Sequence, residues 1–160
     1  MKIRHAKESD IDELTKIEAV SYPAAEGASK KSISERVEAF PKHFWILEDE
    51  GYIKAFINGM VTNETNLTDA MYDNAYMHNN NGEWQMIFSV VTDPKFRGQG
   101  YAGTLMKQVI KDTKKQGSKG IVLTCKEHLL GFYGGFGFQN EGVSESTHGD
   151  VMWYQMRMTF

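Results

Sequence analysis

The chain has 160 residues, a formal net charge of −3 and a pI of about 6.0. This length suits one domain, residues 1–160, and the weakly acidic balance argues against nucleic acid or a membrane surface as a partner. No apolar segment suits a signal peptide or a bilayer span, and the single cysteine, Cys125, cannot form an internal disulfide, so we expect a cytoplasmic protein. With no Cys pair and no His-x-x-x-His spacing, we expect no metal site.

The first half of the chain predicts helices that begin at capping patterns and strands joined by a tight turn. Ser9 with Asp12, and Ser32 with Glu35, have the spacing of N-terminal helix caps. The run Asp49-Glu50-Gly51 is typical of a hairpin turn. The elements expected are a strand at 1–6, a helix after Ser9 with Ile11, Leu14, Ile17 and Val20 on one face, a helix from Ser32 to Phe40, and strands at 43–47 and 52–61.

The second half predicts one strongly amphipathic helix between strands. Apolar residues recur there at helical spacing, at Ala102, Leu105, Met106, Val109 and Ile110. The other elements expected are a loop over 62–82 with one helical turn near Ala70, a strand at 84–92, a strand at 121–125, a short helix near 129–133, and strands at 136–140 and 151–160. Early hairpins and one central β-α-β unit predict an α/β fold with a mixed, mostly antiparallel sheet flanked by helices.

A glycine-rich run lies between the 84–92 strand and the amphipathic helix. Its residues are Arg97, Gly98, Gln99, Gly100, Tyr101, Ala102 and Gly103. Backbone amides of such a loop, with the positive end of the helix dipole, suit a phosphate group. The run satisfies the dinucleotide pattern G-x-G-x-x-G, but five residues separate it from the strand and antiparallel hairpins precede it. We therefore expect a phosphorylated cofactor other than a dinucleotide.

Two motifs resemble those of the GNAT superfamily of N-acetyltransferases. The stretch 97–102 matches the Arg/Gln-x-x-Gly-x-Gly/Ala signature of that superfamily, and 125–138 resembles its second signature, with Tyr133 followed by a Gly-Phe pair. The resemblance covers nearly the whole chain, including the order of strands. More narrowly, Ser21-Tyr22-Pro23 with Glu26, and the ending from His148 to Met156, are similar to the arylalkylamine (serotonin-type) branch.

The resemblance implies that acetyl-CoA is the co-substrate. It assigns the CoA pyrophosphate to the amides of the glycine-rich run and the pantetheine arm to Val90, Val91 and Thr92, with the Val90 amide on the thioester carbonyl. Tyr133 also contacts the cofactor and is the expected general acid, because a phenol with a pKa of about 10 can protonate a leaving thiolate. Without the resemblance, the simpler interpretation is that Tyr133 packs against Phe136 and Phe138 and has no catalytic role.

The resemblance does not supply a base for the incoming amine. An alkylamine has a pKa of about 10 and must lose a proton before it attacks. At the positions where the arylalkylamine branch has histidines, this chain has Met86 and Phe88, which cannot accept one. Glu83 could act through water, although a solvated glutamate at a strand end is the simpler reading. Expected substrate contacts are Tyr22, Glu26, Met86, Phe88 and His148.

These residues predict direct acetyl transfer from acetyl-CoA to a primary amine of a small molecule, such as an arylalkylamine or a polyamine. Two alternatives stay open. A non-catalytic acyl-CoA-binding sensor would keep the cofactor loop and lack the base, and a peptide or protein N-acetyltransferase would have an open groove. The sequence is compatible with a monomer or a homodimer.

Overall fold

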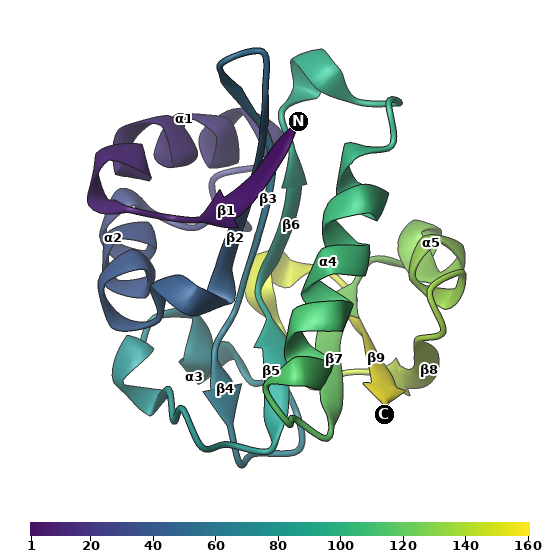
Figure 1. The fold of residues 1–160 in the computed structure, drawn as a ribbon. Helices are drawn as coiled ribbons and strands as arrows, with labels where there is room; N and C mark the ends of the chain where they lie inside the picture. Colours follow the sequence, from purple (N-terminus) through teal and green to yellow (C-terminus); the bar gives the residue numbers. More distant parts are fainter.

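The computed structural model describes residues 1–160 and contains nine strands and five α-helices (Figure 1). In chain order they are β1 (Lys2–His5), α1 (Ile11–Ser21), α2 (Lys30–Ala39), β2 (Phe44–Asp49), β3 (Tyr52–Asn58), β4 (Val61–Thr62), α3 (Asp69–Tyr72), β5 (Trp84–Ile87), β6 (Ser89–Thr92), α4 (Tyr101–Lys115), β7 (Gly120–Cys125), α5 (Leu130–Gly134), β8 (Gln139–Val143) and β9 (Tyr154–Thr159). No helix is both long and apolar enough to span a bilayer.

The strands form two sheets, ordered β1-β2-β3-β6 and β4-β5-β7-β9-β8. Every pair is antiparallel except β5 with β7, which are joined through the crossover helix α4. The predicted mixed, mostly antiparallel fold is therefore confirmed. It is built from two sheets, because β6 pairs with β3 while β5, directly before it, pairs with β7.

Two of the expected strands are interrupted where the chain passes from one sheet to the other. The strand expected at 84–92 divides at Phe88, whose amide donates to Asn58 O at 2.8 Å. The strand expected at 52–61 divides at Gly59, and a Cβ at that position would overlap the carbonyl oxygen of Met86. Only glycine allows the two backbones to approach this closely. Beyond this crossing β6 and β7 separate, which leaves an opening between the sheets.

Helices cover both faces of the first sheet. Figure 1 shows α1 and α2 on one face of this sheet. Leu14 and Ile17 of α1, with Ile33 and Val37 of α2, are buried in the core on that face. On the other face α4 buries three side chains against both sheets, namely Leu105, Met106 and Val109. Each such burial contributes about 1.5–3 kcal/mol. Because the sheet is covered on both sides, β2 and β3 are apolar at successive positions.

Several element boundaries differ from those expected. The N-cap of α2 is Ser29, three residues before the Ser32 expected, and its side chain accepts from the Ser32 amide at 3.2 Å. Helix α1 begins after a 3₁₀ turn at Glu8–Asp10, and Val20, expected on its buried face, is 62% exposed. Strand β8 at Gln139–Val143 lies three residues later than the 136–140 expected, and β9 at Tyr154–Thr159 is a shorter segment within the 151–160 expected.

Candidate active site

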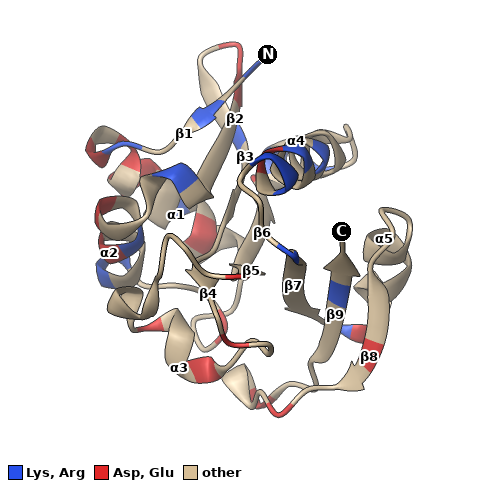
Figure 2. Ribbon diagram, turned by 60° about the horizontal axis from the view of Figure 1, so that its bottom comes forward, with Lys and Arg blue, Asp and Glu red and all other residues tan.

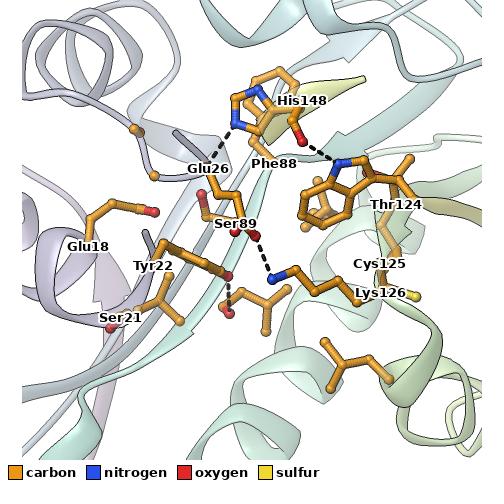
Figure 3. A pocket seen from close by; sticks show the side chains of 18 of the residues that line it. Glu18, Ser21, Tyr22, Glu26, Phe88, Ser89, Thr124, Cys125, Lys126 and His148 are labelled. Carbon is orange, nitrogen blue, oxygen red and sulfur yellow. Dashed lines mark hydrogen bonds and ion pairs between the residues drawn. The ribbon is translucent and has the colours of Figure 1, made fainter. Parts of the chain in front are cut away.

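A cavity of about 810 Å³ occupies the opening between β6 and β7. Its walls come from the end of α1 and the segment after it, from β6 with Phe88, from the end of β7, and from α5. The start of α4 borders one part of it, and His148 and Trp153 border another. Figure 3 shows side chains from these separate elements pointing into the same space. The place where the sheets separate is therefore the candidate active site.

The glycine-rich run enters the cavity region as an exposed loop before α4. Gly98 and Gly100 have φ angles of +79° and +80°, which favour glycine, and helix α4 begins directly after this turn. Gly100 is the N-cap and supplies no side-chain cap, so the first amides of α4 are free for an anion. Basic residues colour much of α4 in Figure 2, and its last turn holds Lys114 and Lys115, which complement the opposite pole of the helix dipole.

The residues predicted to bind the cofactor differ in how they face the cavity. Arg97, Gly98 and Ala102 line it directly. Gln99, Gly100 and Gly103 do not line it. The Tyr101 side chain turns away, and its hydroxyl donates to Asp49 Oδ2 at 3.3 Å. For these residues only the backbone is positioned to act on a ligand at the helix N-terminus.

Strand β6 presents free backbone groups to the opening. The Asp93 amide donates to Lys54 O at 2.9 Å, so these two residues are a hydrogen-bonded pair. Two residues earlier on β6, Val91 and Phe56 form the next hydrogen-bonded pair. Since bonded and non-bonded pairs alternate in an antiparallel ladder, the amides of Val90 and Thr92 point away from β3. No strand pairs with this edge of β6. Val90 and Thr92 can therefore form hydrogen bonds with a chain laid in the opening.

Tyr133 lies on α5 at the wall of the cavity. Its side chain is 5% exposed and packs edge-on against Phe132 and Phe138. Burial raises the pKa of the Tyr133 phenol well above its ordinary value, with smaller contributions from Tyr22 and Cys125. The hydroxyl makes no hydrogen bond within the chain, so it stays protonated and free to donate to a bound group.

The segment after α1 is tied across the cavity by polar contacts. The Tyr22 hydroxyl donates to Val90 O at 3.1 Å, and burial raises the pKa of Tyr22. The Glu26 carboxylate, 7% exposed, forms an ion pair with Lys126 at 2.6 Å, and His148 Nε2 lies 2.8 Å from Glu26 O (Figure 3). Glu26 is thus engaged with Lys126 and joins two walls of the cavity.

His148 is held on the same side of the cavity. Its ring stacks on Tyr72 with centroids 5.0 Å apart, and Trp153 Nε1 donates to its backbone carbonyl at 2.7 Å. Phe88 also borders this region, with the Tyr72 ring 4.8 Å away on one side and the Arg36 guanidinium 4.8 Å from its centroid. These contacts create an aromatic wall.

Of the residues predicted to act on the acceptor substrate, two lie outside the cavity. Met86 is fully buried in a separate cluster with Met60 and Met71, because it precedes the point at which the strand changes sheets. Glu83 stands at the far end of β5, where it forms an exposed ion pair with Lys119 at 3.0 Å. The structure therefore corrects both expectations: Met86 does not line the pocket, and Glu83 is too remote to relay a proton.

Sequence reasoning missed two buried charged residues that line the cavity. Glu18 of α1 and Arg36 of α2 are 1% and 3% exposed. Glu18 follows Leu14 by four residues and Arg36 follows Ile33 by three, so both lie on the apolar faces of their helices. A charged residue at such a position is rare unless it has a function or a partner, and that signal was available in the sequence.

Cys125 also borders the cavity. Its Sγ lies 3.6 Å from Met156 Sδ, and burial raises the pKa of the thiol to about 11. A thiol with so high a pKa is not a thiolate nucleophile at neutral pH. No group of three or more His, Cys, Asp or Glu side chains is arranged to hold a metal ion.

Comparison with known proteins identifies the family. The sequence model of the acetyltransferase (GNAT) family matches residues 11–138. The chain belongs to the GNAT acetyltransferase family. No curated protein matches the sequence. The family assignment agrees with the glycine-rich loop before α4 and with the separation of β6 from β7, and it makes acyl-CoA the cofactor of this GNAT domain.

Solved structures share the GNAT fold over almost the entire chain. The GphF GNAT-like decarboxylase in complex with isobutyryl-CoA has a TM-score of 0.86 at 21% identity and covers 99% of both chains. The loading GNATL domain of CurA from Lyngbya majuscula has a TM-score of 0.85 at 15% identity, covering 99% of this chain and 96% of that one. The ribosomal-protein-S18-alanine N-acetyltransferase from Escherichia coli has a TM-score of 0.72 at 17% identity, covering 99% and 92%.

Proposed function

We propose that this GNAT domain transfers the acetyl group of acetyl-CoA to a primary amine of a small molecule by direct attack on the thioester. The pyrophosphate rests on the amides at the start of α4, and the pantetheine arm runs along β6 toward Tyr133. The Val90 amide donates to the thioester carbonyl oxygen, where negative charge develops in the transition state. Tyr133 protonates the departing thiolate.

The observation that supports a small-molecule acceptor is the set of contacts that join Glu26, Lys126 and His148 across one side of the cavity. Glu26 contacts Lys126 through its side chain and His148 through its backbone carbonyl. At Gly149 a Cβ would lie 2.6 Å from Glu26 Cγ, so the two segments are tightly packed. A peptide would need an open groove here, whereas a compact amine fits beneath the contacts.

The aromatic wall narrows the class of amine. Phe88, Tyr72 and Trp153 provide apolar surface beside the place where the amine must reach the thioester. Such surface suits an arylalkylamine better than a polyamine, because a polyamine carries several charges that would lose hydration on burial. We also propose a reducing, cytoplasmic setting, in keeping with the free, buried Cys125.

The test is a panel of acceptors assayed by release of the CoA thiol, with acetyl-CoA binding measured by calorimetry. We expect turnover with arylalkylamines and slower turnover with polyamines and short peptides. Faster turnover of peptides would make the protein a peptide N-acetyltransferase, and tight binding of CoA with no turnover would make it a sensor. Because one similar structure is a GNAT-like decarboxylase, malonyl-CoA is included without an acceptor, and its conversion to acetyl-CoA and CO₂ would replace the proposal.

A further inference from the structure

Glu18 is a buried carboxyl group that faces the cavity without a hydrogen-bond partner for one oxygen. It lies on the last turns of α1 and is 1% exposed, and its Oε1 is buried and unpaired. Figure 3 shows the side chain reaching from α1 toward Ser89 and Tyr22. An unpaired carboxyl oxygen in a buried position costs free energy unless a ligand or water satisfies it.

The groups around Glu18 only partly compensate for its burial. Burial raises the pKa of Glu18, while Arg36, the Ala28 amide, Ser89 and His148 pull it down less strongly. Arg36 forms no ion pair with Glu18 within 4 Å: its two terminal nitrogens donate to Asn58 Oδ1 and the Tyr72 carbonyl, each at 3.0 Å, and its Nε is buried and unpaired. The carboxyl group thus has room for a cation that the chain itself does not supply.

We propose that Glu18 binds the ammonium group of the acceptor and accepts its proton, so that the acceptor is an amine that is cationic in solution. This inference rests on the proposed acetyl transfer and supplies the base that Met86 and Phe88 cannot provide. The Ser89 side chain lowers the pKa of the Glu18 carboxyl group. Ser89 directly precedes Val90, the residue assigned to the thioester carbonyl. Glu18, Ser89 and Val90 all line the same cavity.

The other two carboxylates at the cavity are less suited to this task. Asp73 is exposed, and its Oδ1 accepts from Ser32 Oγ at 3.1 Å. Glu26 already forms an ion pair with Lys126 at 2.6 Å, so an incoming ammonium would have to displace a lysine. The titratable and charged groups that face Glu18 are Arg36 from α2, Tyr22 from the segment after α1, and His148. None of these three forms an ion pair with Glu18 within 4 Å.

The proton and electron balance of the reaction is complete with the residues named. One ammonium proton passes to the Glu18 carboxylate, and the freed nitrogen lone pair forms the C–N bond at the thioester carbonyl. When the C–S bond breaks, its electron pair goes to sulfur, which takes the Tyr133 proton. The second nitrogen proton restores the Tyr133 phenol, and Glu18 releases its proton to water. The products are the acetamide, free CoA and one proton.

The test compares Glu18→Gln with wild type across pH, using an alkylamine that the wild type acetylates. At pH 7 we expect kcat/KM to fall by about 10²-fold. The loss should shrink as the pH rises toward the pKa of the amine, because the amine then loses its proton to water. With hydroxylamine, which is already neutral at pH 7, the variant should stay near wild type. Glu18→Asp should recover part of the alkylamine activity.

Matched measurements separate this role from a structural one. Glu13→Gln changes an exposed carboxylate on the same helix and should leave the pH profile unchanged. The pKa of Glu18 is raised by folding, so its ionised form destabilises the fold above that pKa, and Glu18→Gln should be at least as stable at pH 7. Equal losses of kcat/KM with the alkylamine and hydroxylamine, or no loss with the alkylamine, would overturn the role of Glu18 and leave the proposed function standing. Absence of wild-type turnover with every amine would instead refute the proposed function.

Discussion

Replacing Tyr133 with phenylalanine removes one hydroxyl from the cavity wall and nothing else. The hydroxyl makes no hydrogen bond within the chain and the ring is 5% exposed, so the change leaves no buried partner unpaired. We therefore expect the free energy of unfolding to change by less than about 0.5 kcal/mol. Loss of a general acid should lower kcat by about 10²-fold, equivalent to about 2.7 kcal/mol in the activation free energy.

The assay is single-turnover formation of the CoA thiol, which isolates the chemical step from product release. Burial raises the pKa of Tyr133, so the wild-type phenol stays protonated from pH 6 to 9, and the ratio of variant to wild type should be flat over that range. Tyr76→Phe is the control, because Tyr76 is 84% exposed and lies outside the cavity. A Tyr133→Phe rate within roughly threefold of wild type would show that another group protonates the thiolate.

Three further predictions concern the cofactor loop and the stability of the fold. Gly100→Ala forces alanine to φ +80° at a cost of about 1–2 kcal/mol, so calorimetry should show roughly tenfold weaker acetyl-CoA binding. Unchanged affinity would contradict the binding of the CoA pyrophosphate by the glycine-rich run. Burial lowers the pKa of His43 from 6.5 to about 4. The free energy of unfolding therefore has its full value above pH 6.5 and falls by about 3 kcal/mol as the pH drops to 4, because the unfolded chain takes up the proton first. Urea unfolding should show a weaker pH dependence in His43→Gln but not in the control His128→Gln, which changes an exposed histidine. Gly59→Ala should prevent stable folding, because its Cβ overlaps the Met86 carbonyl, and a soluble variant with wild-type circular dichroism would refute that account.

The parts of the fold that sequence predicted well are those set by local signals. The 49–51 hairpin turn, the helical turn near Ala70 and the amphipathic helix before Gly117 all occur where expected. Each depends on residues within a few positions of one another, through turn chemistry or helical periodicity. The division of strands at Gly59 and Phe88 was missed, because it depends on which distant strand each segment pairs with. Periodicity within a segment carries no information about that partner.

The features of the candidate site also fall into those that local sequence predicted and those that depend on tertiary structure. The sequence by itself determined the glycine-rich loop and the motif around Tyr133, because a left-handed glycine turn at a helix start and a local signature are encoded within short stretches. Only the tertiary structure decided that Met86 is core, that Glu83 is remote and that Glu26 is paired with Lys126. It also placed Glu18 at the cavity, because burial and electrostatic surroundings arise from residues that meet only when the two sheets separate.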